Sequence, residues 1–176
     1  AYGYSIGEGI AGDAGDVLSV DVAGGKICVS VRPAECRAPD RQRKALDIRG
    51  LFYDILRSQE LASDIQHAHF SIIFSSYGGM VSYAVGADRH CALWKAVGKG
   101  VLSGQSLSDA VAICSGPVDS TMVRAATRAG MSAILSPAPP TDKAVESARA
   151  GGIVLMRFDS PARACIYSGE EALSGI

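Results

Sequence analysis

The sequence predicts an α/β domain with a mixed, largely parallel sheet, and three observations support it. Toward the carboxyl terminus, short apolar runs alternate with helical patterns, as they do in β-α-β units. These runs are apolar almost throughout, which is typical of strands covered on both faces. Upstream, two pairs of β-rich runs each flank a glycine pair, and such hairpins make the sheet mixed.

Two hairpins are predicted in the first half of the chain. The first joins Val17 to Ala23 and Lys26 to Val31 through Gly24-Gly25. The second joins Phe70 to Phe74 and Met80 to Val85 around Tyr77-Gly78-Gly79. Glycine pairs between β-rich runs are a strong hairpin signal because glycine adopts the left-handed conformations that tight turns need.

Two helices complete this half. After a Pro-punctuated loop at 32–40, helical spacing from Gln42 to Leu61 predicts an amphipathic helix capped by Asp40. Its inward residues are expected to be Ala45, Ile48, Phe52, Ile55 and Leu56. Asp88 can cap a second helix, which is expected to bury Ala92, Leu93 and Val97 and to stop at Gly98 or Gly100.

The carboxyl-terminal part supplies the parallel strands. In order, it contains AVAIC (110–114), a helix from Asp119 to Gly130, SAIL (132–135), a helix from Thr141 to Gly151, IVLMRF (153–158) and RACIYS (163–168). Helices between strands are the usual crossovers of parallel pairing. No internal repeat or low-complexity tract interrupts the pattern.

The size fits one domain. The chain has 176 residues, 48% hydrophobic and 20% charged, which is enough for one well-buried core and too little for two ordinary domains. We expect a single domain over 1–176, with an amino-terminal segment, hairpin and loop at 1–41 and an α/β core at 42–176. The chain opens at Ala1 without an initiator Met, so we also expect that an amino-terminal segment is missing from it.

The charge balance excludes a strong long-range field. Seventeen basic residues stand against 18 acidic ones, which offers little to hold nucleic acid or a membrane surface. No apolar run reaches the roughly 18 to 20 residues of a spanning helix, and AYGYSIGEGI lacks the regions of a signal peptide. We therefore expect a cytoplasmic protein without nucleic-acid or membrane partners.

Polar loops follow two neighbouring predicted strands. Ser115-Gly116-Pro117 comes after AVAIC, and Ser136 to Thr141 comes after SAIL. Ligands of open parallel sheets bind at the carboxyl ends of the strands, where helix amino termini carry partial positive charge. The pattern predicts a crevice for a phosphate or another oxyanion. The alternative is that Ser, Gly and Pro only make turns and that Thr141 only caps a helix.

The histidines suggest further site residues. Arg89 and His90, at a predicted helix start, could bind an anion or move a proton, or could be ordinary surface residues. His67 and His69 would share a face only in a strand, and no Cys or carboxylate is spaced to complete a metal site with them. The sequence also lacks the His-x-Glu and Cys-x-x-Cys of zinc deaminases. We therefore expect no bound metal.

The cysteines are five in number and irregularly spaced, which argues against a disulfide framework. Cys36 lies in the polar loop with Arg32, Arg37 and Arg41 near it in sequence, and these charges could stabilise a thiolate. It is a weak catalytic candidate, and an inert thiol is the alternative. The others, Cys28, Cys91, Cys114 and Cys165, lie in apolar elements and are expected to be packing residues.

Two patterns near the amino terminus, GxSxG at 3–7 and GxGxxG at 7–12, lack the preceding strand and following helix that their mechanisms require. We interpret them as chance matches.

The motifs in the carboxyl half resemble those of the formate dehydrogenase accessory protein family, FdhD/NarQ, in order and spacing. DRHCALWKAVG is similar to Arg-His-Asn-Ala-x-Asp-Lys, SGPVDSTMV to Ser-Gly-Arg-x-Ser-x-Glu-Met-Val, and SPAPPTDKAV to Ser-Arg-Ser-Ala-Pro-Thr-x-x-Ala-Val. Upstream, AYGYSIGEGI is similar to Ala-x-Gly-Phe-x-x-Ser-Glu-Gly-Ile, and the match at QELASDIQHAHFS places His69 on the family's His.

The resemblance implies a three-layer sandwich like that of cytidine deaminases, and a homodimer. It also implies a function: the transfer of sulfur from a cysteine desulfurase to the molybdenum cofactor of formate dehydrogenase. The crevice would hold the guanine dinucleotide form of that cofactor or a GDP-like nucleotide. By this resemblance the cofactor-binding residues are His69, Arg89, His90, Ser115, Gly116, Ser136, Pro140 and Thr141.

The chain departs from the family pattern at the residues that carry the family's chemistry. The family's Cys-Gly-x-Cys-Gly loop carries sulfur as a persulfide, whereas Cys36-Arg37-Ala38-Pro39 has one thiol. Pro117 and Pro137 replace two arginines, and Val85-Gly86 replaces Glu-Asp. Two alternatives therefore stay open beside sulfur transfer: a relative that binds the cofactor or assists assembly without transfer, and an unrelated small-molecule enzyme that uses Arg89, His90 and Cys91.

Overall fold

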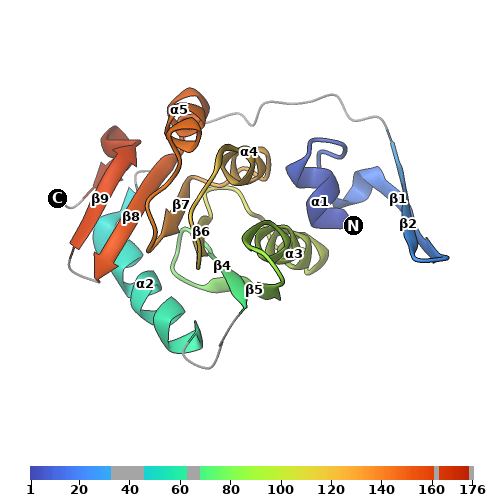
Figure 1. The fold of residues 1–176 in the computed structure, drawn as a ribbon, viewed down its shortest axis with the longest axis horizontal. Coiled ribbons are helices and arrows are strands. Elements are labelled where there is room, and N and C mark those ends of the chain that lie inside the picture. Colours follow the sequence, from blue (N-terminus) through green and yellow to red (C-terminus); the bar gives the residue numbers. More distant parts are fainter. Residues whose placement is uncertain (33–45, 63–67, 161–162, 175–176) are drawn as a thin grey trace.

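The computed structural model describes residues 1–32, 46–62, 68–160 and 163–174. Cys36, Asp40, Ala45 and His67 lie outside them. Six strands form one sheet in the order β5-β4-β6-β7-β8-β9 (Figure 1). Their bounds are β4 His69–Phe74, β5 Met80–Gly86, β6 Val111–Cys114, β7 Ala133–Ser136, β8 Val154–Ser160 and β9 Arg163–Ser168.

The sheet is mixed, as predicted, but the prediction that it is largely parallel is wrong. Only the pairs β6-β7 and β7-β8 are parallel, while β4-β5, β4-β6 and β8-β9 are antiparallel. Connection length explains the pairs β4-β5 and β8-β9, because a parallel pair needs a crossover of about a dozen residues or more. The short links after β4 and after β8 allow only hairpins. The pair β4-β6 is antiparallel because β5 reverses the chain before α3 leads to β6.

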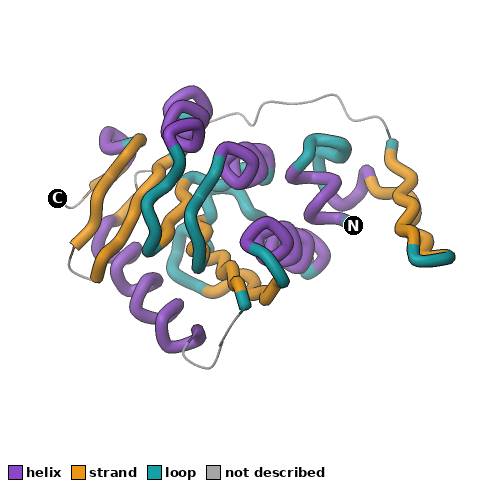
Figure 2. Tube along the Cα trace, in the orientation of Figure 1, coloured by secondary structure: helices purple, strands orange, loops and turns teal. Residues whose placement is uncertain are grey.

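Helices cover both faces of the sheet (Figures 1 and 2). Helix α2, Ile48–Ala62, lies on one face, and α3 (Arg89–Leu102), α4 (Ser120–Arg128) and α5 (Asp142–Gly151) lie on the other. Each face has its own apolar cluster: Ile55 of α2 packs with Ile72, Leu135 and Met156, and Leu93 of α3 packs with Ile134. The arrangement has three layers, helix, sheet and helix.

Two predicted helix boundaries were wrong. Helix α2 begins at Ile48 rather than Gln42, because β3 (Leu46–Asp47) pairs in parallel with β10 (Leu173–Ser174) just before it. On this helix Ile55 is fully buried as predicted, whereas Leu56 is exposed. Helix α3 buries the predicted Ala92, Leu93 and Val97 but continues through Gly98 and Gly100 to Leu102.

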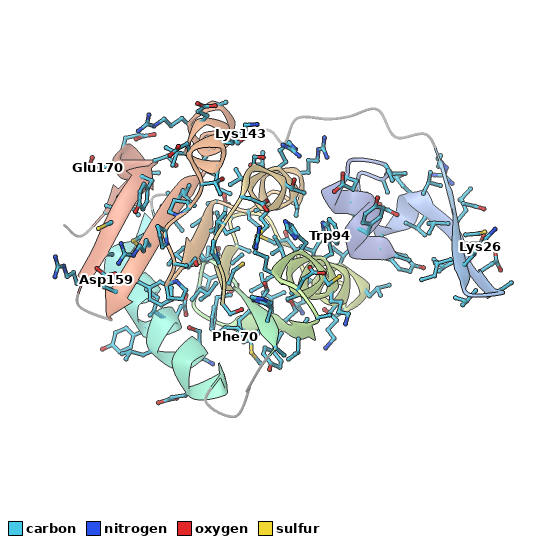
Figure 3. The ribbon with its side chains drawn as sticks, in the orientation of Figure 1. Lys26, Phe70, Trp94, Lys143, Asp159 and Glu170 are labelled. Atoms are coloured by element: carbon cyan, nitrogen blue, oxygen red, sulfur yellow. The ribbon has the colours of Figure 1, made fainter. Side chains whose placement is uncertain are left out.

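The amino-terminal segment adds a helix that the sequence did not predict. Helix α1, Tyr2–Gly7, packs on α3 so closely that a Cβ on Gly3 would lie 1.7 Å from the Trp94 carbonyl oxygen. Only glycine fits there. The Trp94 ring lies between the two helices and meets the Tyr4 ring edge-on, with centroids 4.9 Å apart (Figure 3).

The first hairpin forms with the predicted bounds, β1 Val17–Ala23 and β2 Lys26–Val31. It is a separate two-stranded sheet, and its tip, marked by Lys26 in Figure 3, lies away from the main sheet. A short 3-10 turn, Ala14–Asp16, precedes it, and another, Glu170–Ala172, precedes β10. None of the helices in the described ranges is both long and apolar enough to cross a membrane.

Candidate functional site

The start of β4 and the ends of β5, β6 and β7 lie at one edge of the sheet. His69 pairs with Gly86 across β4 and β5, Ser71 pairs with Cys114 across β4 and β6, and β6 runs parallel to β7. From this edge the chain enters α3, α4 and α5 in turn. Three helix amino termini therefore converge where the sequence predicted a ligand site.

We call the side chains and glycine gathered at this edge the strand-end site. Its members are His69, Arg89, His90, Ser115, Gly116, Asp119 and Ser136. All but Asp119 were predicted from the sequence.

Ser115 joins β6 to the start of β4. Its hydroxyl oxygen accepts a hydrogen bond from the Phe70 N–H at 3.0 Å and lies 3.2 Å from His69 Nδ1. Gly116 follows and is buried, and a Cβ there would come within 3.2 Å of that same ring nitrogen. A side chain at position 116 would therefore press on the His69 ring.

Ser136 ties the two polar loops together. Its hydroxyl donates to the Gly116 carbonyl at 2.7 Å and accepts from the Ala138 N–H at 3.1 Å. A further hydrogen bond runs from the Thr141 N–H to the Val118 carbonyl at 3.0 Å. The two loops lie side by side, as the parallel pairing of β6 and β7 predicts.

Asp119 binds both cationic candidates. Its Oδ2 accepts from Arg89 at 3.0 Å and lies 2.6 Å from His90 Nε2. Its Oδ1 accepts from the N–H groups of Thr121 and Met122 at 3.0 and 3.1 Å, which caps α4. The Asp88 carboxylate caps α3 in the same manner, through the Cys91 N–H at 2.8 Å.

The surroundings keep Asp119 ionised. Partial burial raises the pKa of this carboxyl. Hydrogen bonds from Met122, Arg89 and His90 lower the pKa by more than burial raises it, so it lies below its usual value. The side chains of Arg89, His90 and Asp119 are only 34%, 27% and 21% exposed. Their interaction is therefore less screened than that of a surface ion pair.

The predicted anion crevice stays a prediction. Arg89 and His90 lie where expected, and Asp119 engages both, Arg89 through one terminal nitrogen. In the described part of the chain, Arg89 Nε is buried and has no hydrogen-bond partner. The loops also contain Pro117, Pro137, Pro139 and Pro140, which have no N–H to give to a phosphate. The hydroxyls of Ser115 and Ser136 at this edge also bond within the protein.

Thr141 and Pro140 lie at the margin of the site. The Thr141 hydroxyl accepts from the Ala144 N–H at 3.2 Å and caps α5, which favours the alternative that this side chain is a helix cap. Pro140 is half-buried beside it. Their predicted part in cofactor binding stays a prediction.

Among the thiols outside 33–45, two are exposed. Cys28 and Cys165 lie on outward-facing positions of β2 and β9, so the prediction that they pack in the core is wrong. Cys114 is buried as expected, and burial raises the pKa of its thiol to about 11. A hydrogen bond to Asp88 and partial burial also raise the pKa of Cys91, which disfavours a reactive thiolate there.

Asp119 is the site residue that the sequence did not yield. It was visible only as a helix start, where Asp is a common cap. Its contacts with Arg89 and His90 span 30 and 29 positions of the chain and arise from the packing of α3 beside α4. Within the described ranges, no three His, Cys, Asp or Glu residues are grouped so that they could hold a metal.

Comparison with known proteins identifies the family. The sequence profile of the FdhD/NarQ family matches residues 38–174, which include the whole strand-end site. The chain belongs to the FdhD/NarQ family. This confirms the resemblance drawn from the motifs.

Relatives of the FdhD/NarQ family align at low identity. Protein FdhD of Methanocaldococcus jannaschii is 31% identical over 57% of this chain, and the alignment spans 44% of that relative. The chain therefore matches less than half the length of this relative. The sulfur carrier protein FdhD of Methanothermobacter thermautotrophicus is 23% identical over 98% of this chain and 79% of its own.

A solved structure shares the fold. The crystal structure of a formate dehydrogenase accessory protein from Desulfotalea psychrophila superposes with a TM-score of 0.78 over 98% of this chain and 76% of that one. Its sequence identity is 22%, so the likeness concerns the fold alone. The predicted likeness to cytidine deaminases stays a prediction.

Proposed function

We propose that this chain is an FdhD-type accessory protein that accepts sulfur as a persulfide on Cys36 and delivers it to the molybdenum cofactor of a formate dehydrogenase. The observation that carries the proposal is the strand-end site inside the span that matches the family. There His69 lies within hydrogen-bond distance of Ser115, and Ser136 donates to the Gly116 carbonyl, at the edge where open sheets bind ligands.

The sulfur-accepting step needs one thiolate. The Cys36 thiolate attacks the outer sulfur of a persulfide on a cysteine desulfurase, the bond between the two sulfurs of that persulfide breaks, and the desulfurase leaves as a thiolate. No net oxidation occurs in this step. Delivery of the sulfur at the sulfide level would need a second thiol from outside the chain, which attacks the inner sulfur of the Cys36 persulfide, releases the outer sulfur and leaves Cys36 in a mixed disulfide. Arg37 and Arg41, close to Cys36 in sequence, would favour its thiolate form.

The residues of the strand-end site fit part of the proposed cargo. The His69 imidazole and the Ser115 hydroxyl, both partly exposed, match the edge of a ring system such as a guanine or a pterin. The Ser136 hydroxyl is buried and supports the Gly116 carbonyl from within. The diphosphate of a guanine dinucleotide finds Arg89 already paired with Asp119. We therefore place the uncharged part of the cofactor, or of a GDP-like nucleotide, at this site.

Persulfide analysis tests the transfer function. The protein is incubated with a cysteine desulfurase and sulfur-labelled cysteine, and each thiol is read by mass spectrometry. Label on Cys36 is expected in the wild type, absent in Cys36→Ala and retained in the matched variants Cys28→Ala and Cys165→Ala, which remove exposed thiols. Label on no thiol, or retention after Cys36→Ala, contradicts transfer through Cys36.

A second function, cofactor binding or assembly without sulfur transfer, is favoured by the single cysteine in the loop where the family has two. Calorimetry with GDP and guanosine tests it independently of Cys36. Binding without any persulfide would support this second function, and no binding at millimolar ligand would remove the nucleotide site from both.

The proposed function implies two protein partners and a dimer. We expect the chain to contact a cysteine desulfurase and a formate dehydrogenase, and to form a homodimer in the cytoplasm. Light scattering after size exclusion measures the dimer, and pull-down with each purified partner measures the contacts.

A further inference from the structure

We infer that Asp119 is a specificity-determining residue, a built-in anion that closes the strand-end site to phosphate and restricts it to the uncharged part of a ligand. The inference rests on the proposed function only in that it concerns the same site. The binding of inorganic pyrophosphate can test it even if that function is wrong.

The hydrogen bonds of Asp119 use the full capacity of its carboxylate. A carboxylate has about four acceptor positions on its two oxygens. Thr121 and Met122 donate to Oδ1, while Arg89 and His90 bind Oδ2. Asp119 therefore has no acceptor position left for a ligand, and its role is to occupy these four groups.

The same four groups are those that an oxyanion would use. A guanidinium, an imidazole and the first N–H groups of a helix are the usual partners of bound phosphate. Here an aspartate from the chain itself takes their place. Since Asp119 is fixed at the cap of α4, it competes with a dissolved anion without the entropy loss that binding from solution costs.

The neighbouring loop cannot replace the occupied donors. Pro117 lies between Gly116 and Val118, and Pro137, Pro139 and Pro140 interrupt the loop that follows β7. Proline has no N–H, so these segments cannot form the row of backbone donors that holds phosphate in glycine-rich loops. Arg89 and His90 are thus the groups that decide whether an anion binds. Asp119 has the shorter contact with His90, 2.6 Å against 3.7 Å for Asp88, and it binds Arg89 through one terminal nitrogen, while Arg89 Nε has no hydrogen-bond partner among the described residues.

Two substitutions release Arg89 and His90 while keeping the helix cap. Asp119→Ser leaves a hydroxyl that caps helices well, and Asp119→Asn keeps the shape of the side chain without its charge. Asp88→Ser is the matched control. It also removes an aspartate that caps a helix and that lies 3.7 Å from His90 Nδ1, but it leaves Arg89 and His90 bound to Asp119. Far-UV circular dichroism verifies that each variant is folded.

Calorimetry with inorganic pyrophosphate at constant ionic strength is the deciding measurement. Releasing a cation that then makes charge-assisted hydrogen bonds predicts a gain in affinity of about tenfold or more in Asp119→Ser and Asp119→Asn. A smaller gain is expected in Asp88→Ser, because that variant keeps both contacts of Asp119 and loses only the longer contact of Asp88 with His90. If neither Asp119 variant gains affinity, or if Asp88→Ser gains as much, the inference is overturned.

Nucleosides separate this inference from the proposed function. If Asp119 excludes phosphate, wild-type protein binds guanosine and GDP with similar affinity, whereas Asp119→Ser prefers GDP. A wild type that binds GDP about tenfold more tightly than guanosine overturns the inference while supporting a nucleotide site. If no protein binds guanosine or GDP, the nucleotide site fails, and the pyrophosphate result alone still decides the role of Asp119.

Discussion

Asp88 and Asp119 show how one residue type in one local role acquires two kinds of chemistry. Both carboxylates cap a helix at the same edge of the sheet. Asp88 is 56% exposed at its side chain and lies 3.7 Å from His90 Nδ1, whereas Asp119 is more buried and holds both Arg89 and His90. Local sequence defines both caps and the contact of Asp88 with His90, whereas tertiary packing defines the ion pairs of Asp119.

This distinction limits what the sequence could predict of the site. His69, Ser115 and Ser136 were predicted because their motifs fix their place at strand ends, and the structure brings them together. The ion pair of Arg89 with Asp119 was not predicted, because the two residues are 30 positions apart in sequence. Spacing alone cannot show such a contact.

Asp54 lies in α2 and is 5% exposed. Burial raises its pKa from 3.8 to about 6, with the charge of Arg57 partly opposing the rise. The unfolded chain therefore releases this proton at a lower pH than the folded protein does. Between these two values the unfolded state binds fewer protons, so the free energy of unfolding falls as the pH rises, and it levels off above about 6.

Removing this charge should remove the pH dependence that it causes. The rise in pKa corresponds to up to about 3 kcal/mol, so Asp54→Asn should be more stable than wild type at pH 7 by up to that amount and similar to it near pH 4. Urea unfolding at both pH values measures the difference. Asp21→Asn, which removes an exposed carboxylate, controls for net charge. If the free energy of unfolding changes with pH by the same amount in wild type and in Asp54→Asn, Asp54 does not titrate as described.

At the scale of elements, most helices and strands were predictable, because their periodicity and caps are local. The direction of strand pairing was less predictable, because an apolar strand has the same sequence pattern whether it pairs in parallel or antiparallel. One part of the error was avoidable: IVLMRF and RACIYS are too close in sequence for a crossover, so they had to pair antiparallel. Helix α1 was missed because six residues show too little periodicity.

Helix α1 depends on one glycine for its place. Gly3→Ala would put a methyl carbon 1.7 Å from the Trp94 carbonyl oxygen. Helix α1 must therefore move away from α3 and expose part of Ile6. Overpacking of this kind should lower the free energy of unfolding by about 2 kcal/mol or more. Urea unfolding followed by the fluorescence of Trp94 measures it.

Gly79→Ala is the matched control for Gly3→Ala. Its Cβ would lie 3.5 Å from the nearest atom, Ser75 Oγ, an ordinary contact distance, so stability should change little. Equal losses in the two variants would mean that the close approach of α1 and α3 does not determine the effect.

At the scale of the whole molecule, one sheet serves two cores. Adjacent residues of β7 contribute to opposite faces: Ile134 to the cluster under α3, α4 and α5, and Leu135 to the cluster that includes Ile55 of α2. Both are fully buried. Because the same central strands form both clusters, loss of packing on one face should weaken the other, as in a single cooperative domain.

Leu135→Ala tests this coupling from the face opposite to the single tryptophan. The cavity should cost about 2 to 5 kcal/mol, and the urea midpoint should fall by the same amount whether unfolding is followed by Trp94 fluorescence, which reports on α1 and α3, or by far-UV circular dichroism, which reports on the whole chain. Leu56→Ala, on the same side of the sheet but 42% exposed, should shift both midpoints little. Separate transitions in Leu135→Ala, with the fluorescence change unaffected, would mean that the α2 face unfolds independently and that residues 1–176 are not one cooperative unit.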